Sequence, residues 1–326
     1  MHPFEYIQPR SLKDASRLLA DDPAHTRPIA GGTDLLSELK DGLLRPHRLI
    51  SLASLKPLQT ISYTSGAFRL GAAVTLTQIA HNPALAQAYP LIAQAASVTA
   101  TPQIRNTATL GGNLCQRPRC WYYRHPLFRC LKKGGKVCYA VNGYNKNLAI
   151  LGGAGCYIVH PSDLAPALIA AGASIEIHGT AGLRALSLED FFVGPRQRMT
   201  QENVLSPGDL VAYVNLPSPM PNSRSVYLKA RERQGEDFAM ASVAALASLD
   251  RDTVRHARIV LGGVAPTPHR ARRAEEILAG RRVSDIDPQH VGELAVAGAR
   301  PMRDNAYKVT LAGNLVRSAL DNLLGR

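Results

Sequence analysis

The five cysteines of this chain all lie between Cys115 and Cys156, and the rest of its 326 residues contain none. Thiols that merely filled hydrophobic cores would be scattered along the chain. A secreted disulfide framework is expected in short, cysteine-rich chains, whereas this chain is long and has an odd number of cysteines. The clustering therefore predicts a local thiolate site on one segment of an otherwise ordinary globular protein.

The spacing of these cysteines bears on what they bind. The run Cys120-x9-Cys130-x7-Cys138-x17-Cys156 contains no close C-x2-4-C pair of the kind that structural zinc sites use. Thiolate ligands without histidine partners suit iron–sulfur or zinc. Irregular spacing on a loop suits a cluster whose four irons each bind one thiolate from a different direction. Iron–sulfur, zinc and free thiols all remain open on this basis.

The residues around the cysteines are basic and aromatic. Positive charge near thiolates lowers their pKa and stabilises a negatively charged cluster, but it can equally form a surface that docks an acidic partner. Aromatic rings would shield a cluster from water, or simply form a small separate core. The residues concerned are Arg117, Arg119, Arg124, Arg129, Lys132, Lys133, Lys136, Trp121, Tyr122, Tyr123 and Phe128.

Composition narrows the class of protein. With 326 residues and 45% hydrophobic content, the chain can bury two or three cores. Its net charge of +13 fits an acidic partner, an acidic membrane surface or nucleic acid. No nucleic-acid motif accompanies the dispersed Lys and Arg, so nucleic-acid binding is not expected. We also expect no signal peptide on this chain and no membrane span.

The hydrophobic pattern predicts an α/β protein. Residues 4–47 read as strand, helix, strand, helix, with Ser11 and then Thr33 or Asp34 as helix caps. Further along, the pattern predicts one helix over 85–98, loops over 101–114 and 134–155, and strands at 157–159, 225–230, 239–249 and 255–264, followed by three helices.

The proline-rich run 217–223 is the best linker candidate. We therefore predict two domains, 1–219 and 220–326, with the cysteine segment inserted in the first at about 115–156.

Two glycine-rich loops are candidate phosphate cradles. Residues 28–35 and 103–114 each place a glycine pair where backbone N–H groups can face an anion. Either loop alone is more simply a turn. Together with the Pro-Ser-Asp turn at 161–163 they favour a cofactor that carries a polyphosphate. No G-x-G-x-x-G, P-loop or G-x-S-x-G motif is present, and the ten dispersed histidines read as ordinary surface or core residues.

Several motifs, taken in order, resemble the FAD-binding subunits of the xanthine dehydrogenase and carbon monoxide dehydrogenase family. They are Ala30-Gly-Gly-Thr-Asp-Leu, Arg105-Asn-Thr-Ala-Thr-Leu-Gly-Gly-Asn-Leu, His160-Pro-Ser-Asp, Tyr227-Leu-Lys and Leu261-Gly-Gly-Val-Ala. The resemblance implies an α+β fold. A vanillyl-alcohol-oxidase-type (PCMH-type) FAD-binding domain of two α/β subdomains would precede a C-terminal domain like that of the carbon monoxide dehydrogenase flavoprotein.

The cysteine segment resembles that of the FAD subunits of bacterial periplasmic aldehyde oxidoreductases, and more distantly the flavin subunit of 4-hydroxybenzoyl-CoA reductase. This resemblance implies a [4Fe–4S] cluster on Cys120, Cys130, Cys138 and Cys156, with Cys115 as a thiol that is not a ligand. Carried over in the same way, the residues implied to bind FAD are Ile29, Ala30, Gly31, Gly32, Thr33, Asp34, Leu35, Ile104, Ala108, Thr109, Gly112, Asn113, Gln116, Ser162, Asp163, Val211 and Lys229.

The family also implies how such a chain works. An aldehyde would be oxidised at a molybdenum cofactor on a large subunit, and electrons would pass through two [2Fe–2S] clusters of a small subunit to this FAD and then to an external acceptor. No residue here need be catalytic. Export by a twin-arginine signal on a partner would place the complex in the periplasm, and otherwise it is cytoplasmic. The alternatives are another molybdenum hydroxylase, a self-sufficient flavin oxidase and a zinc-stapled basic binding module.

Overall fold

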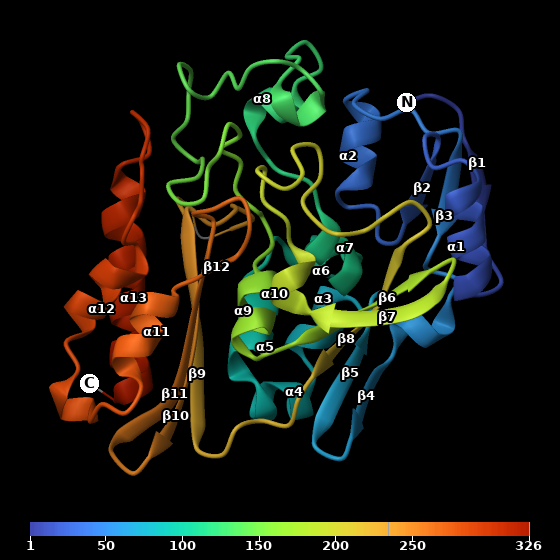
Figure 1. Cartoon of the computed structure of the whole chain (residues 1–326). Coiled ribbons are helices and arrows are strands. Elements are labelled where there is room, and N and C mark those ends of the chain that lie inside the picture. The colour runs from blue at the N-terminus through green and yellow to red at the C-terminus, as the bar shows by residue number, and fades with distance from the viewer. Residues whose placement is uncertain (234, 326) are drawn as a thin grey trace.

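The computed structural model describes residues 1–233 and 235–325 (Figure 1). The chain opens with a small parallel sheet in the strand order β1-β3-β2. Its elements are β1 (Glu5–Ile7), α1 (Leu12–Asp21), β2 (Thr26–Ile29), α2 (Leu35–Lys40) and β3 (Arg48–Ser51). The predicted strand, helix, strand, helix order is confirmed, and the Ser11 hydroxyl caps α1 by accepting from the Asp14 N–H. Asp34 stands at the N-cap of α2 but makes no capping hydrogen bond.

A second sheet has five antiparallel strands in the order β4-β5-β8-β6-β7. Its strands are β4 (Ile61–Thr64), β5 (Ala67–Gly71), β6 (Ser174–Gly179), β7 (Gly182–Ser187) and β8 (Leu210–Leu216). The accompanying helices are η1 (Lys56–Gln59), α3 (Leu76–Ala80), α4 (Pro83–Ala88), α5 (Pro90–Ser97), α9 (Leu164–Ala170) and α10 (Leu188–Phe191). Fully buried Leu70, Ile92, Leu168 and Ile175 tie sheet and helices into one core.

The third sheet is antiparallel, in the order β12-β11-β10-β9. It consists of β9 (Ser223–Ala230), β10 (Ala241–Asp250), β11 (Thr253–Gly262) and β12 (His269–Arg270). One face packs on α5 and α9, and the other on α11 (Arg272–Leu278) and α13 (Tyr307–Leu324), with η3 (Val283–Asp285) and α12 (Pro288–Ala295) beyond. The predicted strands and three closing helices are confirmed, and Figure 1 shows these helices at the outer edge of the molecule.

The cysteine segment is almost entirely irregular. It contains only α8 (Trp121–Arg124) and η2 (Leu131–Lys133) and lies between α2 and the third sheet in Figure 1. Its turns are tight, because a Cβ on Gly135 would stand 1.8 Å from the Arg129 carbonyl oxygen. Among the described helices, none is both long and apolar enough to cross a membrane.

Three local predictions were wrong. The helix expected over 85–98 is two helices, α4 and α5, because Pro90 interrupts it. The loop expected at 101–114 contains α6 (Pro102–Arg105) and α7 (Leu110–Cys115), each capped by a threonine hydroxyl, from Thr101 and Thr109. Residues 157–159 form no regular strand; the backbone there makes isolated pairings, such as Ala149 N–H to Tyr157 C=O.

Candidate functional site

The two glycine loops lie directly against each other. A Cβ on Gly31 would stand 1.9 Å from the Thr107 carbonyl oxygen, so the first loop (residues 29–35) reaches the second (residues 104–116) only because residue 31 has no side chain. Gly32 has a φ of +71°, which a residue with a side chain rarely adopts. Their contact makes one site out of two turns that are 75 residues apart in sequence.

Nearly all the residues expected to bind FAD line two adjoining clefts. The first cleft has a volume of about 280 Å³ and the second about 460 Å³. They share Thr33, Asp34, Gly112 and Gln116. Those in the first cleft are Ile29, Ala30, Gly31, Gly32, Thr33, Asp34, Leu35, Thr109, Gly112, Gln116 and Val211. Those in the second are Thr33, Asp34, Ile104, Ala108, Gly112, Asn113, Gln116, Asp163 and Lys229.

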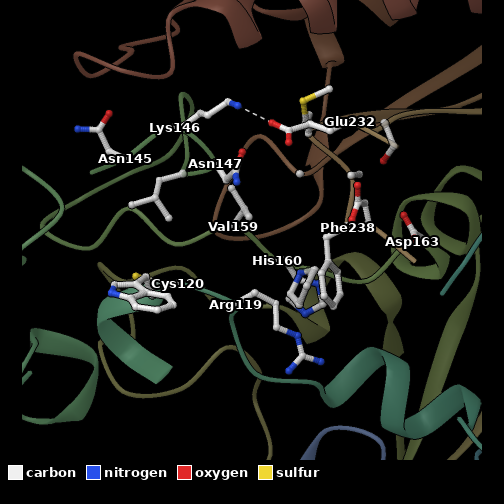
Figure 2. Close-up of a pocket in the computed structure, with 18 of the residues that line it drawn as sticks. Arg119, Cys120, Asn145, Lys146, Asn147, Val159, His160, Asp163, Glu232 and Phe238 are labelled. Atoms are coloured by element: carbon white, nitrogen blue, oxygen red, sulfur yellow. Dashed lines mark hydrogen bonds and ion pairs between the residues drawn. The ribbon is translucent and has the colours of Figure 1, made fainter. Parts of the chain in front are cut away.

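Ser162 is the one expected residue that lines neither cleft. It borders a third cleft, shown in Figure 2, together with Asp163. The Ser162 hydroxyl donates to the Asn113 side-chain oxygen at 2.5 Å and accepts from the Ala165 N–H at 2.9 Å. It therefore joins the second glycine loop to the start of α9.

Asp163 anchors the far end of the second cleft. Its carboxylate accepts from the Tyr227 hydroxyl and from Lys229 Nζ, both at 2.8 Å. The Asp163 and Lys229 side chains are 4% and 3% exposed, so this charge pair is almost fully shielded from water. Burial, and then the Asp163 charge, raise the pKa of Tyr227 well above its ordinary value. The phenol thus stays a hydrogen-bond donor.

Sequence reasoning missed Tyr227 and His160 as site residues, although both stand in the motifs quoted above. Tyr227 and Lys229 are two apart on β9, so their side chains leave the strand on the same face. His160 is buried against Phe192 and borders the third cleft (Figure 2). Burial lowers the pKa of His160 to about 4, so the ring is neutral near pH 7.

The structure brings four of the five cysteines together. Cys120, Cys130, Cys138 and Cys156 line one small cavity of about 10 Å³. Its wall is mainly aromatic and aliphatic, formed by Tyr122, Tyr123, Leu131, Tyr139, Leu148, Tyr157 and Ile158. Cys115 is elsewhere, on the first cleft. Burial raises the pKa of Cys115 to about 12, so this half-buried thiol is protonated near pH 7.

The separation of the thiols bears on the metal. Among the described residues, no three cysteine sulfurs lie within 4.8 Å of one another. One zinc ion with bonds of about 2.3 Å would bring its sulfurs to about 3.8 Å from each other. A cuboidal cluster holds its thiolates farther apart because each binds a different iron. As they stand, no three of these sulfurs are close enough together to bind a single ion.

Backbone groups and charge also act on the thiols. Burial raises the pKa of Cys120 to about 11, and N–H groups of Tyr123 and Tyr122 oppose this shift by hydrogen bonding to its sulfur. Burial raises the pKa of Cys156, against a hydrogen bond from the Ile158 N–H and the charge of Lys132. Such N–H groups are the kind that stabilise cluster sulfurs and set their potential.

Most of the arginines near the cysteines face carboxylates instead. Arg119 and Arg124 both pair with Asp34, the latter at 2.7 Å, and the Arg117 N–H donates to the other Asp34 oxygen at 2.7 Å. Burial alone would raise the pKa of Asp34, but these two guanidinium groups lower it overall. Arg119 and Arg124 therefore pair with a residue of the first glycine loop, a role that neither sequence interpretation of the basic residues included.

A second carboxylate, Glu202, forms buried ion pairs with the cysteine segment. Glu202 pairs with Arg117 and with Lys132, each at 2.8 Å, and the Lys132 and Glu202 side chains are 2% and 4% exposed. Tyr123 donates to Glu38 at 2.6 Å beside them. The cysteine segment is therefore connected to α2 and to the chain near residue 202 by buried, charge-assisted contacts.

Comparison with known proteins agrees with this geometry. The family model "FAD binding domain in molybdopterin dehydrogenase" matches residues 2–219, and "CO dehydrogenase flavoprotein C-terminal domain" matches residues 226–323. The chain belongs to the FAD-binding subunits of the xanthine dehydrogenase and carbon monoxide dehydrogenase family, which are subunits of molybdenum-dependent oxidoreductases.

Individual relatives refine this family. The chain is 34% identical to the aldehyde oxidoreductase FAD-binding subunit PaoB of Escherichia coli (strain K12), covering 90% of this chain and 89% of the relative. It is 26% identical to the carbon monoxide dehydrogenase medium chain of Hydrogenophaga pseudoflava, covering 98% and 96%. A chain in the structure of quinoline 2-oxidoreductase from Pseudomonas putida 86 superposes with a TM-score of 0.76 at 26% identity, covering 99% and 97%.

The expected fold class is confirmed by these matches. The division at residues 219 and 220 stays a prediction, and one of the two domain matches ends at residue 219. A basic binding module without a redox role is excluded as the class of this protein, because its relatives are oxidoreductase subunits.

Proposed function

We propose that this chain is the FAD-containing electron-transfer subunit of a heterotrimeric, molybdenum-dependent aldehyde oxidoreductase. Its partners are a large molybdenum-cofactor subunit and a small subunit with two [2Fe–2S] clusters. The observation that carries the proposal is the convergence of two glycine loops on adjoining clefts lined by sixteen of the seventeen expected residues. Aldehyde as the substrate class is supported by 34% identity to an aldehyde oxidoreductase subunit.

The chain's own residues supply binding and orientation. Backbone N–H groups beside Gly31 and Gly32 and at the start of α7 are suited to the FAD pyrophosphate. Asp163, held by Tyr227 and Lys229, presents fixed charge at the far end of the cleft. The bound flavin supplies the redox chemistry, in taking electrons from the small subunit and passing them to an external acceptor.

The proposal is tested by separating this chain from its partners. The purified complex should oxidise an aldehyde in the presence of an artificial acceptor, and this chain alone should not, because the substrate site lies on the large subunit. Aldehyde oxidation by the isolated chain would instead indicate a self-sufficient flavin oxidase. A complex that rejects aldehydes but hydroxylates an aromatic substrate would support the alternative of a 4-hydroxybenzoyl-CoA-reductase-like or other molybdenum hydroxylase.

We further propose that Cys120, Cys130, Cys138 and Cys156 hold a [4Fe–4S] cluster. Two features support it: the four thiols line one small cavity, and the wall of that cavity is mainly aromatic and aliphatic. Bound in this way, the cluster would be an electron conduit or would hold the segment together.

The cluster is tested by two cysteine variants. Cys130→Ser should lose about four irons per chain while largely keeping FAD, because it removes a thiolate from the cavity. Cys115→Ser should keep its iron, because Cys115 lies outside that cavity. Iron and zinc are measured on protein purified without oxygen. Unchanged iron in Cys130→Ser, or stoichiometric zinc in the wild type, would refute the assignment.

The compartment depends on the partners. Co-export with a partner that carries a twin-arginine signal would place the complex in the periplasm, and a complex without one would be cytoplasmic. Cell fractionation followed by flavin measurement distinguishes the two.

A further inference from the structure

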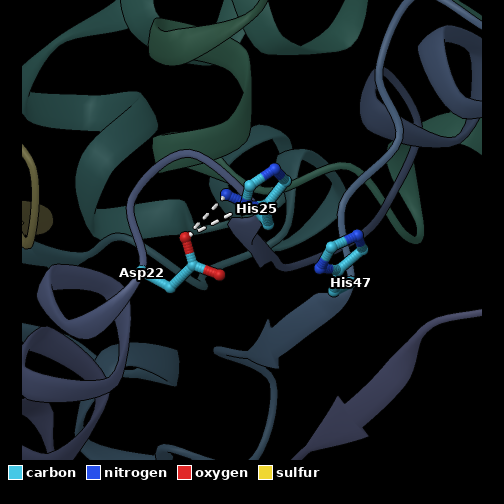
Figure 3. A group of neighbouring side chains, drawn as sticks. All are labelled: Asp22, His25 and His47. Atoms are coloured by element: carbon cyan, nitrogen blue, oxygen red, sulfur yellow. Dashed lines mark hydrogen bonds and ion pairs between the residues drawn. The ribbon is translucent and has the colours of Figure 1, made fainter.

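The N-terminal sheet brings two histidines and an aspartate together at one end, away from both cofactor sites. His25 immediately precedes β2 and His47 immediately precedes β3. These strands are parallel, with Thr26 opposite Arg48, so the two histidines are cross-strand neighbours. The chain turns from α1 into β2 at Asp22, which places its carboxylate beside them (Figure 3).

The backbone fixes this juxtaposition. The N–H groups of His47 and Arg48 both donate to the His25 carbonyl, at 2.8 and 3.1 Å. The two imidazole rings are stacked with centroids 4.4 Å apart and planes 6° from parallel. His25 Nδ1 lies 3.1 Å from Asp22 Oδ1. Among the described residues, this is the only group of three that offers His, Cys, Asp or Glu ligand atoms all within 4.8 Å of one another.

We propose that Asp22, His25 and His47 form a surface site for a transition-metal dication such as Zn²⁺ or Ni²⁺. Two imidazole nitrogens and one carboxylate oxygen suit these borderline ions, whereas Mg²⁺ and Ca²⁺ require mostly oxygen ligands. Three protein ligands would leave the remaining coordination positions to water.

Only a small rotation of the two histidine side chains is needed for the three residues to bind a metal ion. Bonds of about 2.1 Å to one tetrahedral ion place its ligand atoms about 3.4 Å apart. The stacked rings must therefore splay about χ1 and χ2 so that one nitrogen of each meets the ion. Both histidines are exposed, and the His25 side chain is 49% exposed, so the rings have solvent into which they can rotate.

The local charge permits a cation. Arg48 lies 4.0 Å from Asp22 Oδ2 but is paired with Asp21 at 3.1 Å, so Asp21 offsets its repulsion. Asp22 Oδ1, the oxygen nearer His25, stays available to the ion. A bound ion would join the end of α1 to the starts of β2 and β3. Because β2 leads directly into the first glycine loop, the ion would stabilise the subdomain that carries that loop.

The test uses the full chain without an affinity tag, dialysed against a chelator and titrated with Ni²⁺ by calorimetry. Ni²⁺ is chosen because it prefers nitrogen ligands, which limits binding to the cysteine segment. We expect one saturable site outside that segment, and a rise in melting temperature with added Ni²⁺. Both His25→Ala and His47→Ala should weaken the affinity at least about tenfold, since even outer-sphere losses commonly cost 10–100-fold.

His290→Ala is the matched control, because His290 is exposed on α12, remote in sequence from the three ligands, and should bind as the wild type does. Circular dichroism confirms that each variant is folded. The proposal is overturned if the wild type shows no saturable site, or if His25→Ala and His47→Ala bind Ni²⁺ as tightly as the wild type. Neither result depends on the FAD or cluster assignments.

Discussion

Asp163 shows how much a single residue can determine in this protein. It precedes α9 in the first half of the chain, but its two partners, Tyr227 and Lys229, come from β9. A carboxylate with 4% exposure is stable only with its charge balanced and its oxygens hydrogen-bonded. The triad therefore fixes the far end of the second cleft and attaches the third sheet to it.

Replacing Lys229 should show how strongly the stability of the protein depends on this triad. Lys229→Met leaves Asp163 buried without its counter-charge and is expected to cost on the order of 3 kcal/mol of unfolding free energy. Urea denaturation measures this loss, and retained FAD shows whether the cleft survives. Lys146→Met is the matched control, because Lys146 and its partner Glu232 are 41% and 50% exposed and should contribute little. Equal stability of the two variants would contradict the role given to the triad.

The Cys115 thiol should react slowly with alkylating reagents in the folded protein. Burial raises its pKa to about 12, so the folded chain keeps the thiol proton where an unfolded chain, with its ordinary pKa near 9, has lost it. The folded state is therefore favoured below about pH 9, and this contribution declines as pH rises toward 12. Iodoacetamide at about pH 8 should leave Cys115 unmodified in the native protein and label it after unfolding, by peptide mass spectrometry. Rapid labelling of the native protein would contradict this environment.

At the scale of elements, the contact between the two glycine loops is the most demanding feature of the fold. Gly31→Ala would place a methyl group 1.9 Å from the Thr107 carbonyl oxygen and push the loops apart. The variant should therefore purify with much less FAD per chain, measured by absorbance after the flavin is released. Gly42→Ala is the control: its φ of +70° costs about 1 kcal/mol in strain, but nothing lies within 4 Å of the added carbon. Full FAD content in Gly31→Ala would contradict the cradle.

FAD binding at the first glycine loop and iron binding at the cysteine segment should both depend on Asp34. Asp34 contacts Arg119 and Arg124, which flank Cys120 and α8, so the two proposed cofactor sites share this carboxylate. Asp34→Asn keeps the shape but removes the charge, and we expect both FAD and iron per chain to fall. Asp14→Asn, in an exposed pair with Arg17, is the control and should change neither. If Asp34→Asn lost FAD and kept all its iron, the two sites would be independent.

The type of each helix or strand could be predicted from local sequence patterns, but the elements it packs against could not. Alternation and capping residues were enough to predict α1, β9, β10 and α13, since these signals are local. Short helices such as α7 were missed because a Thr cap, rather than hydrophobic periodicity, starts them. At the sites, motif resemblance predicted residues that the structure brings together on adjoining clefts and one cysteine cavity, but the Asp22, His25 and His47 group depends on a parallel strand register that sequence spacing does not reveal.

Charge is unevenly distributed over the whole molecule. No Asp or Glu occurs between Asp41 and Asp163, so the entire surplus of positive charge comes from that stretch. Some of its cations pair with acids from other parts of the chain, among them Arg69 with Glu176, Lys132 with Glu202 and Lys146 with Glu232. The buried Lys132–Glu202 pair connects the cysteine segment to a later part of the chain, and the Arg69–Glu176 pair joins β5 to β6 within the second sheet.

The C-terminal helix completes the assembly. Lys308 on α13 is fully buried, and its Nζ donates to the carbonyls of Asn147, Leu148 and Gly263 at 3.0, 3.2 and 2.7 Å. Asn305 donates to the Leu148 and Ala149 carbonyls from the same side. The last helix of the chain thus holds the final stretch of the cysteine segment, which borders both the cysteine cavity and the third cleft.

If this chain is the relay subunit, electrons from the substrate must reach its flavin. The direct measurement is the visible spectrum of the purified complex, mixed with an aldehyde in the absence of oxygen and of any acceptor. The flavin absorbance should bleach within a single turnover and return when an acceptor is added. A flavin that stays oxidised while the partner's iron–sulfur bands bleach would show that this chain is not the relay.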